Sequence, residues 1–152
     1  MTLSGFFPLL TETIEFQQIK NQLNQESNSQ SVIIPDPSIA FTLAVLWSEL
    51  RRPVFVMTQT PDDARKMVDQ LTLWCGESAP VYQFLETDHI PFERYIGDLG
   101  GTHQRLHVIS KLSQIDDSGC PPIVVSSVSA AVHKTLKKSS FENSSCLISV
   151  NE

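Results

Sequence analysis

Short apolar runs alternate with helical segments along most of the chain, and this alternation restricts the possible folds more than any other feature. The runs contain few charged residues, which is typical of strands that are buried on both faces. Strands are expected at 32–34, 53–58, 81–84, 122–126 and 146–150. Because helices of about 10–15 residues separate most of them, right-handed crossovers are expected. The predicted fold is α/β: a doubly wound, mainly parallel five-stranded sheet with helices on both faces.

The helix signals agree with this arrangement. Helices are expected at 11–25, 38–50, 60–75, 102–114 and 127–136. The strongest start signal is TPDD at 60–63, where a capping threonine precedes a proline and two acids. Residues 25–31 are polar and contain no core residue, which indicates a linker. We therefore expect an N-terminal helix and linker at 1–30 and an α/β subdomain at 31–152.

Charge and cysteine content exclude several classes of protein. The chain has 11 Lys and Arg against 17 Asp and Glu, a net charge of −6, which disfavours nonspecific binding of nucleic acid. The cysteines, Cys75, Cys120 and Cys146, form no CxxC motif and are expected to be free thiols in a reducing compartment. No apolar run approaches the roughly 18 residues of a membrane span, and the N-terminus lacks a basic signal-peptide region. A cytoplasmic location is expected.

The loop after the first expected strand has the position of a phosphate-binding P-loop. The aligned residues are Pro35, Asp36, Pro37, Ser38, Ile39, Ala40, Phe41 and Thr42. Pro35 and Ala40 occupy the two glycine positions and Phe41 the lysine position, so that only Thr42 matches. The prolines remove N–H donors, and Asp36 places a negative charge where a triphosphate would bind. We therefore predict a degenerate P-loop, with no ATP, magnesium or other cofactor in this chain.

Other chemical motifs are incomplete. His103 and His107 have metal-ligand spacing on an expected helix, but a third ligand is missing, and no metal site is predicted. The serines at 126, 127 and 129 do not form the G-x-S-x-G motif of a hydrolase. No catalytic residue is assigned.

Two segments contain candidate contacts with another domain or with DNA. The segment 85–95 is long and aromatic, and it either packs under the sheet edge or forms a contact surface. The lysines at 134, 137 and 138 lie at the end of the last expected helix, where they either complement the helix dipole or bind an acidic partner. The candidate contact residues are Phe92, Arg94, Arg105, Ser127, Lys134 and Lys137.

Several of these segments resemble a known family. Residues 85–94, LETDHIPFER, resemble the WETLPYDR stretch of the bacterial transcription-repair coupling factor (Mfd) family. The stretches RRPVFV at 51–56, GGTHQRL at 100–106 and IVVSSVSAA at 123–131 also resemble segments of that family. The similarity extends over roughly residues 32–150, in the same order and at similar separations.

The resemblance implies that the chain is the first subdomain of the family's N-terminal module, which is similar to UvrB. It implies a P-loop NTPase or helicase-like fold with a degenerate P-loop, which serves as a non-catalytic scaffold and helps to recruit UvrA in transcription-coupled nucleotide excision repair. Full-length members are ATP-dependent translocases on double-stranded DNA that displace stalled RNA polymerase. The motor, the polymerase contact and the UvrA-binding subdomain are then expected beyond residue 150, and neighbouring subdomains are the direct partners.

Two alternatives remain open at this stage. The chain could be a stand-alone α/β enzyme that binds a nucleotide or small substrate at the switch point of the sheet. It could also be a receiver-like interaction module, although Phe84 and Leu85 end the third expected strand where a receiver needs acids.

Overall fold

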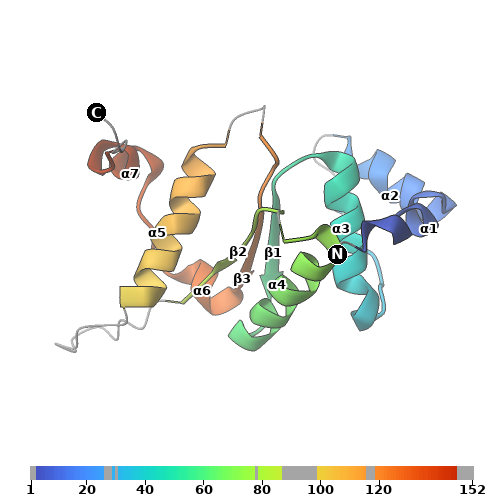
Figure 1. Ribbon diagram of the computed structural model, residues 1–152, viewed down its shortest axis with the longest axis horizontal. Helices are drawn as coiled ribbons and strands as arrows, with labels where there is room; N and C mark the ends of the chain where they lie inside the picture. Colours follow the sequence, from blue (N-terminus) through green and yellow to red (C-terminus); the bar gives the residue numbers. More distant parts are fainter. Residues whose placement is uncertain are drawn as a thin grey trace.

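The chain folds around a small parallel sheet that is flanked by helices (Figure 1). The computed structural model describes residues 3–25, 29, 31–77, 79–86, 99–115 and 119–146. The strands are β1 (Val54–Thr58), β2 (Val81–Phe84) and β3 (Ile123–Ser127). They lie in the order β1-β3-β2, and β3 pairs in parallel with both neighbours. The central strand is therefore the last of the three in sequence.

Three predicted strands agree closely with the observed ones. The expected runs at 53–58, 81–84 and 122–126 differ from β1, β2 and β3 by one residue at most at each end. In the observed register, Ile123 lies beside both Val54 and Val81, and Ser126 lies beside Phe84. The carboxyl ends of the three strands consequently meet at one edge of the sheet, which is where parallel sheets bind ligands.

Three of the helices that the structure describes follow a residue whose side chain caps them. The helix bounds are η1 Ser4–Phe6, α1 Pro8–Thr11, α2 Ile14–Leu23, η2 Asp36–Ser38, α3 Ile39–Leu50, α4 Pro61–Cys75, α5 Leu99–Ser113, α6 Val128–Val132 and α7 Lys138–Ser144. The hydroxyl of Thr60 accepts a hydrogen bond from the backbone N–H of Asp63, which confirms the predicted start of α4. Thr13 and Ser127 cap α2 and α6 in the same way. No helix in the described ranges is long and apolar enough to cross a membrane.

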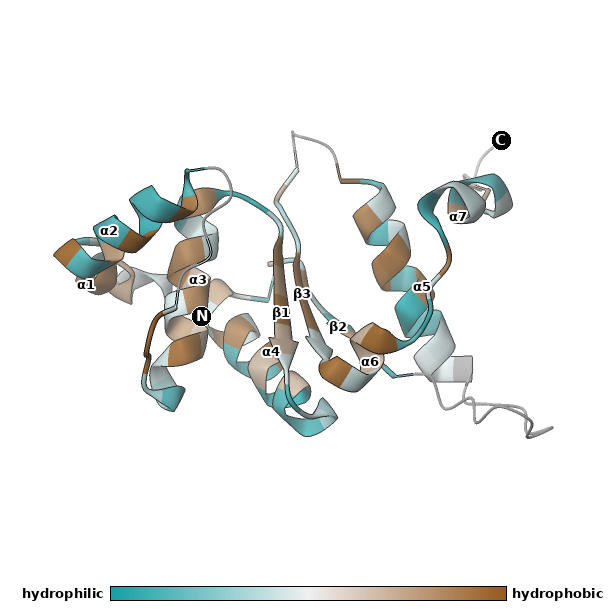
Figure 2. Ribbon diagram, turned by 180° about the vertical axis from the view of Figure 1, so that it is seen from behind, coloured by the Kyte–Doolittle hydropathy of each residue, from teal (hydrophilic) through white to brown (hydrophobic). Residues whose placement is uncertain are grey.

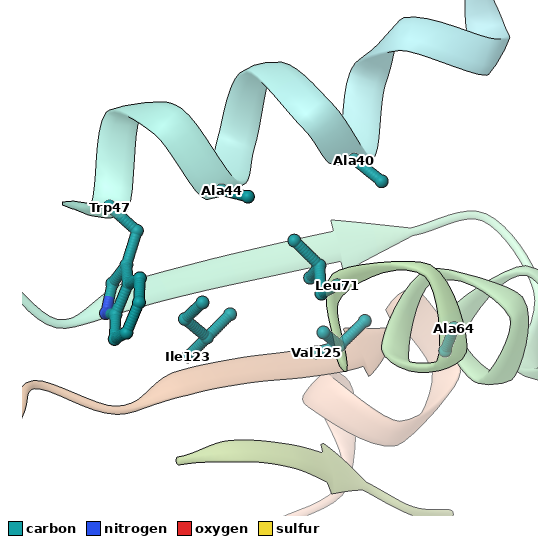
Figure 3. Packing of buried hydrophobic residues seen from close by; sticks show 7 residues of the cluster. All are labelled: Ala40, Ala44, Trp47, Ala64, Leu71, Ile123 and Val125. Atoms are coloured by element: carbon teal, nitrogen blue, oxygen red, sulfur yellow. The ribbon is translucent and has the colours of Figure 1, made fainter. Parts of the chain in front are cut away.

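The main core lies between one face of the sheet and the helices α3 and α4. Figure 3 shows Ala40, Ala44 and Trp47 directed from α3 toward Ile123 and Val125 of β3, with Leu71 of α4 among them. The other cluster of buried residues joins α5 to the sheet through Phe84, Val108 and Val124. Figure 2 shows β1 and β3 mostly in apolar colours between helices of mixed colour. Successive strand residues thus reach opposite layers, as the pleat requires.

The N-terminal helices α1 and α2 pack against α3. Phe16 of α2 is only 2% exposed, and Phe7 packs against the main core. The Lys20 ammonium lies 2.6 Å from the Glu49 carboxylate, and the Arg52 guanidinium donates to the Leu23 carbonyl at 3.5 Å. The polar segment that follows α2 therefore does not separate the N-terminal helices from the rest of the described fold.

The expected strand at 32–34 is wrong. These residues are irregular, and Ile33 is 99% exposed. The run is only three residues long and leads directly into Pro35 and the short η2 helix. It forms no backbone pairing with the described strands of the sheet. The described sheet has three strands rather than five. Residues 147–150, which hold most of the last expected strand, lie outside the described residues.

The end of the last expected helix is also wrong. The helix expected at 127–136 ends at Val132, because His133 adopts an extended conformation. Lys134 therefore lies in an irregular segment, and Lys137 precedes α7, which the sequence did not predict. Neither lysine is at the C-terminal end of a helix, so the dipole explanation for them does not hold.

Candidate functional site

The P-loop-like segment forms a tight turn rather than an anion cradle. The Ser38 N–H donates to the Pro35 carbonyl at 2.8 Å, and the turn continues directly into α3. The Thr42 hydroxyl, the one matching P-loop group, donates back to the Ser38 carbonyl at 2.9 Å and is 9% exposed. Pro35, Asp36 and Pro37 are exposed. These observations leave a negative side chain and few free N–H groups at the turn.

No strand among the described residues precedes the turn, as a P-loop would require, and Phe41, the residue aligned with the P-loop lysine, belongs to an aromatic cluster. The Phe41 ring lies 4.7 Å from the Trp74 ring of α4 and 6.2 Å from the Phe7 ring of the N-terminal segment. Ala40, at the second glycine position, is 1% exposed and belongs to the main core. The two residues aligned with phosphate-binding positions, Ala40 and Phe41, are thus used for packing.

A second cluster lies at the carboxyl edge of the sheet. The Ser127 hydroxyl, at the end of β3, donates to the Glu86 carboxylate at 3.0 Å and accepts the Ala130 N–H at 3.1 Å. The Ser129 hydroxyl also donates to the Glu86 carboxylate, and the two serine hydroxyls lie 3.1 Å apart. Ser127 is 2% exposed. The cluster therefore ties the segment after β2 to the N-terminus of α6.

The Arg105 guanidinium lies at the carboxyl edge of the sheet and bonds to backbone carbonyls there. Its guanidinium donates to the Leu85 carbonyl at 2.5 Å, the Ala130 carbonyl at 3.1 Å and the His133 carbonyl at 3.4 Å. It also lies 4.0 Å from the centre of the Phe84 ring. Burial lowers the pKa of Arg105 from its usual value. No described carboxylate lies within ion-pair distance of it.

The structure brings together only some of the predicted contact residues. Arg105 and Ser127 share the carboxyl edge, but both are buried and engaged with their own chain. Lys134 and Lys137 are exposed. Phe92 and Arg94 lie outside the described residues. Arg105 consequently connects β2, α5 and α6 and is not placed to meet a DNA backbone.

Sequence reasoning missed Glu86 and Ser129 as members of the edge cluster. A signal for them existed, because Glu86 follows β2 closely and Ser129 follows β3 by two residues. Ends of neighbouring parallel strands lie side by side, so polar residues just after them meet. The order of the strands, which made β2 and β3 neighbours, was the missing information.

The described residues offer no evident metal site or activated nucleophile. No group of three or more His, Cys, Asp or Glu side chains in these ranges could hold a metal ion. His103 and His107 are exposed on α5, and the His107 ring lies edge-on to Tyr82 at 5.8 Å. Burial, and secondarily Cys120, raises the pKa of the Cys75 thiol to about 11, so this thiol is protonated near neutral pH.

Comparisons of the chain with protein-family models, with curated proteins and with solved structures find no match.

Proposed function

We propose that this chain is a non-catalytic, helicase-like α/β scaffold, the first subdomain of the UvrB-like module of a transcription-repair coupling factor. In this role it binds no nucleotide, and it supports the neighbouring subdomain that recruits UvrA. The observation that carries the proposal is the aromatic cluster of Phe7, Phe41 and Trp74 at the degenerate loop. This cluster replaces phosphate-binding groups with packed side chains.

The electrostatics of the loop support the same conclusion. A triphosphate needs converging N–H groups and a cation, whereas this turn presents two prolines and Asp36. The net charge of −6 adds no compensating attraction for an anion.

The carboxyl edge also favours a scaffold over an enzyme. The Glu86 carboxylate accepts from two serine hydroxyls, and the Arg105 guanidinium donates to three backbone carbonyls. The Ser127 hydroxyl is buried and also accepts the Ala130 N–H, so its contact with Glu86 serves to fix the start of α6. The proposed roles of the longer protein, in ATP-driven translocation, polymerase displacement and UvrA recruitment, belong to other subdomains.

Isothermal titration calorimetry with ATP, ADP and magnesium tests the proposal. We expect no binding heat at micromolar to submillimolar nucleotide, because the loop offers neither converging N–H donors nor a positive charge. The matched variant Asp36→Asn removes the negative charge without adding a donor to the backbone, and it should remain silent.

A variant that restores the P-loop residues extends this test. The combined change Pro35→Gly, Ala40→Gly and Phe41→Lys restores the P-loop residues, but it should create no ATPase activity because the rest of a motor cleft is not supplied. Micromolar ATP affinity in the wild-type chain, or turnover in the triple variant, would contradict the scaffold proposal.

A further inference from the structure

One side of β1 has no strand partner among the described residues. The Val54 N–H donates to the Pro122 carbonyl at 3.0 Å, so the backbone N–H and C=O groups of Val54 point toward β3. In a parallel pair every second residue bonds to the same neighbour. Val56 and Thr58 therefore also face β3, and Phe55 and Met57 direct their N–H and C=O groups to the outer side of the sheet. We call this outer side of β1 the open edge.

The side chains at the open edge are apolar and exposed. Phe55 is 55% and Met57 is 57% exposed. Both lie on the face opposite Val54 and Val56, which pack toward α3 and α4. Unpaired backbone groups combined with exposed apolar side chains form a template for an added strand.

We propose that a second copy of this chain occupies the open edge, through antiparallel pairing of β1 with β1 of the partner. The register is self-complementary about Val56. Phe55 of one copy then lies opposite Met57 of the other, and each such pair exchanges both backbone hydrogen bonds. The two copies are related by a twofold axis that passes through Val56 perpendicular to the sheet. Such an axis maps each face of the sheet onto itself, so the Phe55 and Met57 side chains of both copies lie on the same face of the joined sheet.

The charges at the two ends of β1 favour the antiparallel partner over a parallel one. Arg51 and Arg52 precede β1 and are exposed, while Asp62 and Asp63 follow it and are exposed in the first turn of α4. Antiparallel pairing brings Arg51 of one copy beside the aspartates of the other, whereas Arg52 bonds to the Leu23 carbonyl of its own chain. A parallel copy would place like charges together, which is unfavourable.

Analytical ultracentrifugation of the full chain tests this pairing. At tens of micromolar the wild type should sediment with twice the 17.0 kDa chain mass, and its dimerisation should weaken with salt. Met57→Lys should raise the dimer dissociation constant by about tenfold or more, since an edge lysine opposes strand addition. Leu73→Lys is the matched control, because Leu73 is 56% exposed on α4, away from the open edge, and it should leave the dimer intact.

A charge exchange tests the direction of the pairing. Arg51→Glu should weaken the dimer, and adding Asp62→Arg should restore it. Hydrogen exchange should show concentration-dependent protection of the amides of Phe55 and Met57. A wild-type monomer at all concentrations, an open-ended series of larger assemblies, or a dimer unaffected by Met57→Lys would overturn the proposal. Nucleotide calorimetry is unaffected by any of these outcomes, so this proposal and the proposed function fail separately.

Discussion

At the scale of single residues, the Arg105 guanidinium holds three elements together. It donates to carbonyls that follow β2 and that lie within and after α6, while its own backbone belongs to α5. A planar group with several donors in fixed directions can satisfy this set of acceptors, whereas an ammonium on a flexible stem cannot. The positive charge is stabilised here by backbone dipoles and by the Phe84 ring.

Arg105→Lys is therefore expected to destabilise the chain although it keeps the charge. The free energy of unfolding should fall by about 2–3 kcal/mol, because buried carbonyls lose their donors. Urea unfolding followed by tryptophan fluorescence measures this change. Arg65→Lys serves as the control. Arg65 is exposed, and its ion pair with Asp62 contributes at most about 0.5 kcal/mol to the free energy of unfolding. Equal stability of Arg105→Lys and the wild type would contradict the bridging role.

At the scale of elements, the carboxyl edge depends on the cap of α6. Ser127 ends β3 and caps α6 with the same hydroxyl that bonds Glu86. α6 has only five residues and would be marginal alone, so its position depends on this cap and on the burial of Ala130.

Ser127→Ala tests this dependence. We expect a loss of about 1–2 kcal/mol in unfolding free energy, because the cap bond disappears and Glu86 loses one donor. Circular dichroism during urea unfolding measures the loss. The comparison is Ser113→Ala, where the hydroxyl donates only to the Ser110 carbonyl of its own helix and a smaller change is expected. A loss at Ser127 no larger than at Ser113 would refute the shared role of the hydroxyl.

The elements also show how far the sequence predicts this fold. β1, β2 and β3 were predictable because each is a run of apolar or β-branched residues bounded by turn residues. Val32–Ile34 has the same local character, yet it is irregular, since a strand requires a neighbour that local sequence cannot specify. For the same reason Glu86 was not assigned to the edge cluster. The degenerate P-loop stays a prediction, because no strand in the described part of the chain precedes residues 35–42.

At the scale of the whole molecule, the N-terminal helices are an integral part of the structure. Phe7 completes the aromatic cluster with Phe41 and Trp74. Phe16 of α2 is buried and lines a cavity together with residues 32–35. This cavity of about 240 Å³ is lined on one side by Leu10, Phe16 and Ile19 and on the other by Ile34 and Pro35. The docking is therefore apolar, with the Lys20–Glu49 pair at its margin.

Two variants on one helix test whether this docking stabilises the whole chain. Phe16→Ala should lower the free energy of unfolding by about 3 kcal/mol or more, as expected for a buried phenylalanine. Ile14→Ala should change it little, because Ile14 is 72% exposed. Limited proteolysis should then cleave Phe16→Ala faster after α2. If both variants unfold like the wild type, the N-terminal helices do not stabilise the fold.

The position of β3 in the sheet has a consequence for biosynthesis. β1 and β2 touch only through β3, which is the last of the three to be translated. A nascent chain that has emerged from the ribosome as far as α5 can therefore form helices, but it cannot close the sheet. Pairing must wait for residues 123–127, which makes folding dependent on contacts distant in sequence and correspondingly slow.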